Sequence, residues 1–299
     1  MKLKEKFKNL RAVPLICDAS MAEYTTYKTG GAAQVLALPQ NINQIKDLVN
    51  FADAEKINWR VMGFGSNILA GGGGIEGVVC CLKNLKGMEI RNNLLISASG
   101  EAFDNVIASA VNLGLEGLEN LSGIPGSVGG AVFMNAGAYG SETFDNIISV
   151  LAMDLRGNIK TLDKTFLKPY YRRVEGLENC IILSARWQLR QAKNIETLKA
   201  RRLEILRRRT QKQPLEYPSA GSVFKRPKDN FASALIDKCG LKGLRSGGAM
   251  VSEKHAGFII NYDNASPADI KNLIEEVQKK VFEKTGVKLE LEQILWGKF

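Results

Sequence analysis

Apolar residues recur along this chain with the spacing of amphipathic helices in some segments and of buried strands in others. Helical spacing is found over 41–56, 102–117 and about 267–285, and the second segment ends at glycines, which commonly terminate helices. The same spacing returns over 193–212, where arginines and lysines fill most of the other positions. Each of these segments is predicted to be a helix.

Shorter apolar runs that are bounded by glycine or proline are typical of strands. They occur over 28–39, at both ends of 58–82, and over 94–101, 147–155 and 179–189. Strands and helices therefore alternate along the chain, which predicts an α+β or α/β organisation. A domain boundary is expected near 190–215.

Glycine interrupts these patterns in the first half of the chain. The segment 122–140, SGIPGSVGGAVFMNAGAYG, has six glycines in nineteen positions. Inside regular structure each glycine costs roughly 0.5–1 kcal/mol relative to alanine. The backbone of this segment is therefore expected to lie so close to something else that side chains are excluded.

Two glycine loops, 63–67 (GFGSN) and 123–130 (GIPGSVGG), are candidates for binding a diphosphate. Neither is a P-loop, because Gly-Lys-Ser/Thr does not follow, and the first has Ile68 where a Rossmann fingerprint needs its third glycine. Both combine glycines, whose amide groups can point inward, with serine hydroxyls. Together they could hold one extended dinucleotide. Tight turns between packed strands are the alternative.

Composition narrows the class of protein. Hydrophobic residues make up 45% of the chain and charged residues 24%, as in ordinary soluble globular proteins. No apolar run approaches the roughly 18 residues of a membrane span, and the charged N-terminus lacks the apolar core of a signal peptide. Reduced, buried thiols in a cytosolic protein are expected at the scattered cysteines: Cys17, Cys80, Cys81, Cys180 and Cys239.

The formal net charge is +10, and much of the excess lies in the segment 193–212. The first interpretation of this segment is a solvated amphipathic helix that links two domains. A basic surface that attracts an anionic small molecule is the second. Nucleic-acid binding ranks last, because aromatic residues are not interleaved with the basic ones.

The order of several motifs resembles that of the UDP-N-acetylenolpyruvoylglucosamine reductase family. These motifs are GFGSNILAGGGGIEGVV, LENLSGIPGSVGGAVFMNAGAYG, PYYRR, PSAGSVFKRP, KHAGFIIN and LELEQILWG. The match begins near Thr29 and continues to the C-terminus. The resemblance implies a bacterial cytoplasmic enzyme that makes UDP-N-acetylmuramate for peptidoglycan. The short interval between PYYRR and the basic helix resembles the family's shorter form, which lacks an inserted substrate-clamping loop.

The resemblance also implies the fold and the cofactors. The fold is α+β, with a two-subdomain FAD-binding part of the vanillyl-alcohol-oxidase (PCMH) type and a third domain that covers the substrate. The implied divisions are 1–87 and 88–192 for FAD, 193–213 for the linker helix, and 214–299 for the substrate domain, whose last residues can return to the FAD site. FAD is bound non-covalently, NADPH is the reductant, the substrate is a UDP-sugar, and neither nucleic acid nor a membrane is a partner.

The two glycine loops are implied to hold the FAD diphosphate. The residues concerned are Gly63, Gly65, Ser66, Asn67, Gly123, Pro125, Gly126, Ser127, Gly129 and Gly130. We expect valine at Gly126 or Gly129 to weaken FAD retention more than it harms the fold.

The implied reaction reduces an enol ether C=C that is conjugated to a carboxylate, so negative charge develops at the α-carbon and on the carboxylate. Arg172 matches the family's arginine at the substrate carboxylate, and Ser222 matches its proton donor to the α-carbon. Glu292 matches the terminal glutamate that works with the arginine. Tyr171 would line the site, and Lys225 could bind the diphosphate or the carboxylate.

For each catalytic candidate, a nearby residue of the same type is an alternative assignment. Arg173, Ser219 and Glu290 are the alternatives, and without the resemblance every candidate reads as an ordinary surface or turn residue. Val174 and Leu291 stand where the family usually has serine and proline, so local hydrogen bonding and turn geometry differ there.

His255 is the only histidine, so a Ser-His-Asp hydrolase, a His-ligated metal site or a histidine-linked flavin has little support. His255 is expected to be structural. The predicted function is an NADPH-dependent flavoenzyme that reduces UDP-N-acetylglucosamine enolpyruvate. The alternatives are a flavin oxidase of the same superfamily and a basic nucleic-acid-binding protein without enzymatic activity.

Overall fold

The computed structural model describes residues 7, 10 and 12–299, which form two compact units. Unit 1 consists of the described residues up to Ile16, Val35–Phe64 and Gly77–Arg208. Unit 2 consists of Cys17–Gln34, Gly65–Glu76 and Arg209–Phe299. The chain passes repeatedly from one unit to the other, so each unit combines segments that are far apart in the sequence.

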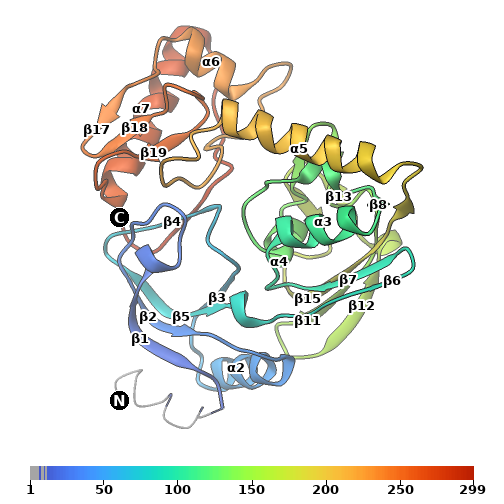
Figure 1. Cartoon of the computed structure of the whole chain (residues 1–299). Helices are drawn as coiled ribbons and strands as arrows, with labels where there is room; N and C mark the ends of the chain where they lie inside the picture. Colours follow the sequence, from blue (N-terminus) through green and yellow to red (C-terminus); the bar gives the residue numbers. More distant parts are fainter. Residues whose placement is uncertain (1–6, 8–9, 11) are drawn as a thin grey trace. The chain divides into compact units, whose positions relative to one another are not determined.

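A five-stranded antiparallel sheet forms the centre of unit 1 (Figure 1). Its order is β12 (Ile159–Asp163), β11 (Ile147–Asp154), β15 (Cys180–Gln188), β7 (Leu94–Ala98) and β6 (Met88–Arg91). The apolar runs over 94–101, 147–155 and 179–189 are therefore strands, as predicted.

Both faces of this sheet are covered by helices. On one face, Ile182 and Trp187 of β15 share a buried cluster with α3 (Phe103–Asn112) and α4 (Val128–Phe133). On the other face, Ile181 and Leu183 share a second cluster with α2 (Ile42–Ala54). Successive side chains of a strand point to opposite faces. The strand is nearly continuously apolar because both of its faces are buried.

A four-stranded sheet has the order β1 (Leu15–Ser20), β2 (Ala32–Ala37), β5 (Ile75–Cys81) and β3 (Trp59–Met62). Strands β3 and β5 run parallel, with Trp59 opposite Val78 and Met62 opposite Cys81. The first glycine loop begins at Gly63, directly after β3. The sheet therefore fixes where this loop starts.

Short elements complete unit 1. The strand pairs are β8 (Leu115–Glu116) with β16 (Arg190–Gln191), β9 (Gly137–Ala138) with β10 (Ser141–Glu142), and β13 (Lys168–Tyr170) with β14 (Arg173–Glu175). Turns of 3₁₀ helix lie at η3 (Leu82–Asn84), η4 (Glu119–Leu121) and η5 (Lys164–Phe166). The predicted basic helix is α5 (Ile195–Lys212), and its Leu198 packs into the cluster of α3 and α4.

Unit 2 contains the helices α6 (Ala232–Lys238) and α7 (Pro267–Thr285) and the sheet β17 (Arg245–Ser246), β18 (Ala249–Val251) and β19 (Ile259–Asn261), with η2 (Met21–Glu23) near its start. Helix α7 begins with a capping box between Ser266 and Asp269 and ends at Gly286, which has a left-handed φ of 70°. These signals explain why the boundaries of α7 are readable from the sequence.

The last strand of the chain pairs with an early one inside unit 2. Strand β20 (Ile294–Trp296) lies parallel to β4 (Ile68–Ala70), with Ile294 opposite Ile68. Strand β4 follows Asn67, the last residue of the first glycine loop. The C-terminal residues of the chain are thus held directly beside that loop.

The expected burial of the cysteines is correct at three positions and wrong at others. Cys80, Cys81 and Cys239 are buried and free, and burial raises the pKa of the Cys81 thiol. Cys17 is exposed, because it lies in the middle of β1 where Ile16 and Asp18 are exposed as well, and Cys180 is half-buried. Only the buried thiols are protected from solvent.

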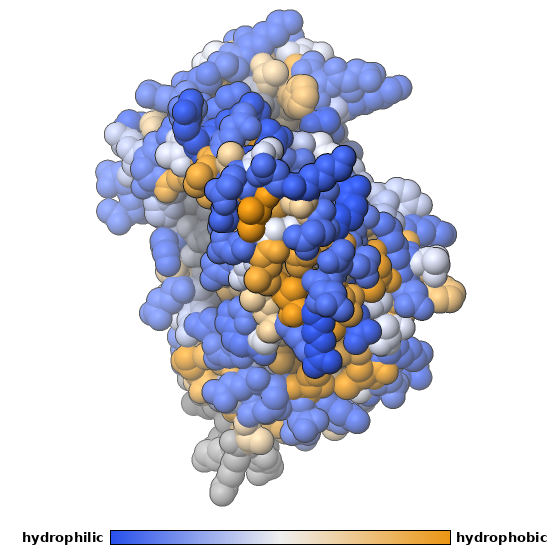
Figure 2. Space-filling model, turned by 45° about the vertical axis from the view of Figure 1, so that its right-hand side comes forward, coloured by the Kyte–Doolittle hydropathy of each residue, from blue (hydrophilic) through white to orange (hydrophobic). Residues whose placement is uncertain are grey.

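The face of the molecule in Figure 2 is mainly hydrophilic, with small groups of hydrophobic residues between the polar ones. Among the described residues, no helix is both long enough and apolar enough to cross a membrane.

Candidate active site

The two glycine loops meet inside unit 1. A Cβ on Gly63 would overlap with the hydroxyl of Ser127, which lies in the second loop and is buried. Gly63 is also the acceptor for the thiol of Cys81 at 3.3 Å. The absence of a side chain at Gly63 is therefore required by the approach of the second loop.

The second glycine loop is shaped by hydrogen bonds from its own backbone. Val128 and Gly129 donate their amide hydrogens to the carbonyls of Glu101 and Ser99, at 2.9 Å each. The Ser127 hydroxyl accepts the amide of Gly130 at 3.2 Å and so caps α4. The loop thus has a fixed conformation in the protein itself.

Gly129 lacks a side chain for a reason within the protein itself. A Cβ at this position would lie 2.8 Å from the Cβ of Ser99, closer than such atoms pack. Gly130 is exposed, and its Cβ would meet only the Ser127 hydroxyl at 3.5 Å, which is ordinary contact. A side chain at Gly129 would therefore disturb the packing against Ser99, whereas Gly130 has room for one. That valine at Gly129 weakens FAD retention more than it harms the fold stays a prediction.

The composition of these loops suits the diphosphate of a dinucleotide, but the amides of Gly123, Gly129 and Gly130 donate within the protein and not toward a ligand. Gly63 and Ser127 bring the loops together, as one extended ligand requires, and Gly126 adopts a φ of 126° that favours glycine. Beneath Gly129, the buried hydroxyl of Ser99 finds no hydrogen-bond partner among the described residues. A buried polar atom without a partner is uncommon in native proteins, and a group bound beside it is one explanation.

The rest of the first loop belongs to unit 2 and is held there. The carbonyl of Gly65 accepts the amide of Thr26 at 3.4 Å. The side-chain amide of Asn67 donates to the carbonyl of Glu292 at 3.0 Å, and the amide of Ile294 donates to the carbonyl of Asn67 at 2.9 Å. Asn67 is thus fixed to the residue that the sequence selects as the terminal glutamate. Ser66 is half-buried between Gly65 and Asn67.

Glu292 lies beside the segment of Ser222. Its amide donates to the carbonyl of Val223 at 2.9 Å, and Ser222 itself forms a backbone bridge with Phe258. Both Ser222 and Glu292 are half-buried. Unit 2 therefore brings together Asn67, Ser222 and Glu292 from three distant parts of the chain.

Lys225 and Glu290 form an ion pair on the surface of unit 2. Their charged atoms are 3.6 Å apart, and 42% of the Lys225 side chain and 73% of the Glu290 side chain are exposed. Exposed pairs of this kind contribute little to stability, so Lys225 can exchange this partner for an anionic ligand. Glu290 is exposed, whereas Glu292 is half-buried.

Arg172 occupies the two-residue turn between β13 and β14 in unit 1. Its φ is 59°, a left-handed conformation that is uncommon for residues other than glycine. Its guanidinium donates to the carbonyl of Gly137 at 3.3 Å and lies 4.7 Å from the centre of the Tyr171 ring. Arg173 is exposed and pairs with Glu178 at 2.9 Å. Arg172 is therefore the less exposed of the two arginines.

Asn135 is a residue that the sequence analysis did not select. It is completely buried, has a φ of 40°, and accepts the amide of Phe144. Its side-chain amide donates to the carboxylate of Glu142 at 2.6 Å and to the carbonyl of Tyr170 at 3.1 Å. Asn135 thus anchors the turn of Arg172 to the segment 122–140. Its position in that segment was the available signal.

A second residue that was not selected, Gln293, supports the segment of Ser222. Its side-chain amide donates to the carbonyl of Ala220 at 3.1 Å, and its oxygen accepts the hydroxyl of Tyr27 at 3.0 Å. Gln293 and Tyr27 are buried, and burial raises the pKa of the Tyr27 hydroxyl far above its usual range. The Tyr27 hydroxyl therefore stays protonated and donates.

His255 has the structural place that was expected. Its Nδ1 accepts the amide of Gly257 at 3.1 Å, and its ring packs edge-on against Phe258 at 4.9 Å between ring centres. Burial lowers the pKa of His255 below its usual range. Because Nδ1 is an acceptor, the ring is neutral in this arrangement.

Two family models match the chain. One is described as "UDP-N-acetylenolpyruvoylglucosamine reductase, C-terminal domain" and covers residues 213–296, and the other is described as "FAD binding domain" and covers residues 33–163. The second range contains both glycine loops. The prediction of an FAD-binding part is thereby confirmed.

Curated relatives span nearly the whole chain. The UDP-N-acetylenolpyruvoylglucosamine reductase of Clostridium botulinum (strain Hall) is 44% identical over 285 residues, which are 95% of this chain and 92% of that protein. The reductase of the same name from Enterococcus faecalis is 40% identical over 298 residues, which are 99% of each chain.

A solved structure has the same fold. The crystal structure of UDP-N-acetylenolpyruvylglucosamine reductase from Thermus caldophilus matches with a TM-score of 0.82 and 31% identity, over 95% of this chain and 99% of that one. The predicted α+β class is confirmed by this match and by the mixed sheets and helices of both units.

Proposed function

Because the chain belongs to the UDP-N-acetylenolpyruvoylglucosamine reductase family, as its motifs predicted, we propose that it reduces the double bond of UDP-N-acetylglucosamine enolpyruvate. It is an FAD-dependent oxidoreductase of peptidoglycan synthesis. NADPH is the proposed reductant, and the cytoplasm, where the nucleotide-sugar is made, is the proposed location.

One observation supports assigning the proposed reaction to particular residues. Glu292 donates its amide to Val223, next to Ser222, and accepts the side-chain amide of Asn67 through its carbonyl. The backbone of Glu292 is therefore bonded next to Ser222 and to one end of a glycine loop within unit 2, which supports Ser222 as the proposed proton donor and Glu292 as the proposed carboxylate beside it. Such a cluster suits a reaction in which a carbon next to bound cofactor must receive a proton.

FAD supplies a hydride to the β-carbon of the substrate when it is bound. The loops that contain Gly63 and Ser127 would hold its diphosphate. The remaining residues proposed for this role are Gly65, Ser66, Asn67, Gly123, Pro125, Gly126, Gly129 and Gly130. The unpartnered Ser99 hydroxyl beneath Gly129 supports this assignment.

The substrate side requires a cation and an acid. Arg172 would neutralise the carboxylate on which negative charge develops, because its planar fork can donate two parallel hydrogen bonds. The left-handed backbone of Arg172 and its contact with Tyr171 support this role. Ser222 would donate a proton to the α-carbon, and Glu292 would assist near the same carbon. Lys225 would contribute to binding the anionic substrate.

The domain roles are proposed in the same way. Residues 1–87 and 88–192 would bind FAD, 193–213 would link, and 214–299 would bind the substrate and return to the FAD site through β20. Pairing of β20 with β4, directly after Asn67, supports the last point.

The experiment that tests the proposal separates the two halves of turnover in Ser222→Ala. Reduction of FAD by NADPH needs no proton on the α-carbon, so the variant should reduce its flavin at close to the normal rate. Reoxidation by the enolpyruvyl substrate needs that proton, and it should slow by about 10² to 10⁴-fold. Stopped-flow absorbance of the flavin follows both steps.

Ser219→Ala is the matched control, because Ser219 lies in the same turn and is also half-buried. Both of its rates should stay close to normal. Equal slowing of both steps in Ser222→Ala, or slowing of neither, would show that the proton comes from another group. A protein that takes up no FAD would end the flavoenzyme proposal itself.

A further inference from the structure

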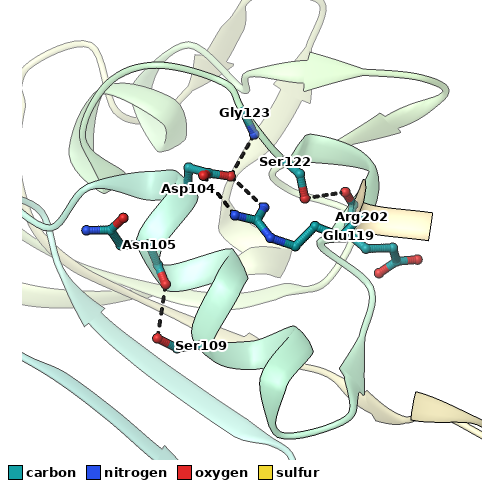
Figure 3. A network of polar contacts seen from close by, with 7 residues as sticks. All are labelled: Asp104, Asn105, Ser109, Glu119, Ser122, Gly123 and Arg202. Carbon is teal, nitrogen blue, oxygen red and sulfur yellow. Dashed lines mark hydrogen bonds and ion pairs between the residues drawn. The ribbon is translucent and has the colours of Figure 1, made fainter. Parts of the chain in front are cut away.

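Helix α5 uses one of its arginines to hold a carboxylate in unit 1. Figure 3 shows the guanidinium of Arg202 facing Asp104, with Nη1 2.7 Å from Oδ1 and Nη2 2.9 Å from Oδ2. Only 15% of the Arg202 side chain and 34% of the Asp104 side chain are exposed. Two parallel hydrogen bonds fix the orientation of the carboxylate as well as its charge.

The same carboxylate holds the start of the second glycine loop. Oδ1 of Asp104 accepts the amide of Gly123 at 2.6 Å (Figure 3). Gly123 has a left-handed φ of 74°, so its amide is directed by a backbone conformation that other residues rarely adopt. Three residues far apart in the sequence are thereby joined: Gly123, Asp104 and Arg202.

Asp104 is well placed to set the shape of the loop, because it lies in the first turn of α3. The preceding residue, Phe103, donates its amide to the carbonyl of Gly126 at 3.0 Å. The start of α3 therefore holds the loop at Gly123 and at Gly126. The orientation of Asp104 decides the first of these two attachments.

A second arginine of α5 supports the segment just before the loop. Nε of Arg201 donates to the side-chain oxygen of Asn120 at 3.0 Å, and Asn120 donates to the hydroxyl of Ser141 at 3.0 Å. Arg201 thus holds the chain at Asn120 directly, and Arg202 holds it at Gly123 through Asp104. This part of the basic helix is committed to contacts within unit 1.

We propose that Arg202 is a positioning residue for FAD: acting through Asp104, it fixes the glycine loop 123–130 in the conformation that binds the FAD diphosphate. This inference rests on the proposed function of that loop. The inference also explains part of the positive charge of α5, because Arg201 and Arg202 shape a binding loop for an anionic cofactor.

The test measures FAD binding to apoprotein of Arg202→Gln, Arg202→Lys and Asp104→Asn, together with hydrogen exchange of the peptide that contains residues 118–130. Arg207→Gln is the matched control, because Arg207 lies on the same helix and is exposed. The quenching of FAD fluorescence gives the Kd without any substrate. Thermal unfolding of each apoprotein reports the stability of the fold.

We expect Arg202→Gln to raise the Kd for FAD by about tenfold, the size of one lost charge-assisted hydrogen-bond pair. Arg202→Lys keeps the charge but not the fork, so its Kd should lie between those of Arg202→Gln and the wild type. The double variant Arg202→Gln/Asp104→Asn should bind FAD no more weakly than the weaker single variant, since both changes break one chain of contacts. Exchange should rise in 118–130 and stay near wild type elsewhere.

The opposite results separate this inference from the proposed function. If the wild type binds no FAD, the proposed function fails and the inference fails with it. If the wild type binds FAD but Arg202→Gln and Arg207→Gln bind it equally well, only the inference is overturned. It is also overturned if Arg202→Gln raises exchange throughout unit 1, because Arg202 then supports the fold in general. Should that variant not fold, Arg202→Lys decides between the same outcomes.

Discussion

At the scale of single residues, Arg172 occupies a backbone conformation that costs about 1 kcal/mol or more for a residue with a Cβ. Glycine or asparagine would suit this turn better. Lys28 and Lys56 adopt the same conformation, so the backbone of Arg172 is consistent with a functional site but does not identify one. The motif PYYRR indicated an arginine but could not tell Arg172 from Arg173, because the register of a two-residue turn depends on how the flanking strands pair.

We predict that Arg172→Lys loses at least about tenfold in kcat/KM, since lysine cannot reproduce the paired hydrogen bonds of a guanidinium on a carboxylate. Steady-state kinetics with the enolpyruvyl substrate measure the loss. Arg173→Lys is the control and should retain activity, because Arg173 is exposed and pairs with Glu178. The reverse result would move the assignment by one residue.

His255 gives a prediction about pH. Burial lowers the pKa of the folded protein's imidazole below the unfolded value of about 6.5. Between these two values the unfolded chain binds more protons than the folded one, so acidification through this window destabilises the fold. His255 is the only histidine, so its ¹H NMR titration is unambiguous. An apparent pKa at or above 6.5 in the folded protein would contradict the prediction.

At the scale of elements, the glycine loops show what sequence analysis recognises and what it misses. The glycines of 123–130 predicted a place of close approach, which is found at Gly129 but not at Gly130. Their neighbours were not predictable, because Ser99 and Glu101 follow β7 and reach the loop only through the folding of the sheet. Gly63 faces Ser127 for the same reason.

The loop yields a prediction with two adjacent glycines. Gly130→Ala should leave the apoprotein as stable as wild type or more stable by up to about 1 kcal/mol, because alanine favours the helix and has room. FAD binding should nevertheless weaken. Gly129→Ala should destabilise the apoprotein, because its Cβ would press on Ser99. Thermal unfolding and FAD titration of both variants distinguish these effects, and equal stability of the two would refute the steric argument.

At the scale of the whole molecule, local patterns identified the helices α2, α3, α5 and α7, whereas the choice of α+β over α/β came from the family resemblance. They did not indicate that the terminal strand β20 joins β4, because nothing in LELEQILWG specifies a partner more than two hundred residues away. The resemblance supplied Glu292, whereas Asn135, Gln293 and Tyr27 emerge only from the folded contacts. The periodicity of apolar residues along the sequence does not predict which distant strands pair with one another.

The purified protein is predicted to be yellow and to release intact FAD on denaturation. Removal of FAD should lower the thermal midpoint, since a ligand at 100 times its Kd stabilises the folded state by about 2.7 kcal/mol. Visible absorbance and thermal unfolding with and without added FAD provide the measurement. A colourless protein whose thermal midpoint does not change when FAD is added would contradict the prediction.

The bond between Asn67 and Glu292 spans 225 positions of the sequence, and this has a consequence for synthesis in the cell. A ribosome that adds about 5–20 residues per second needs roughly 10–45 s to cover that interval. The first glycine loop stays without its C-terminal support for all of that time. A chain released before Glu292 therefore lacks this hydrogen bond and strand β20 together. We therefore expect the first glycine loop to reach its native conformation only after Glu292 and β20 have been synthesised.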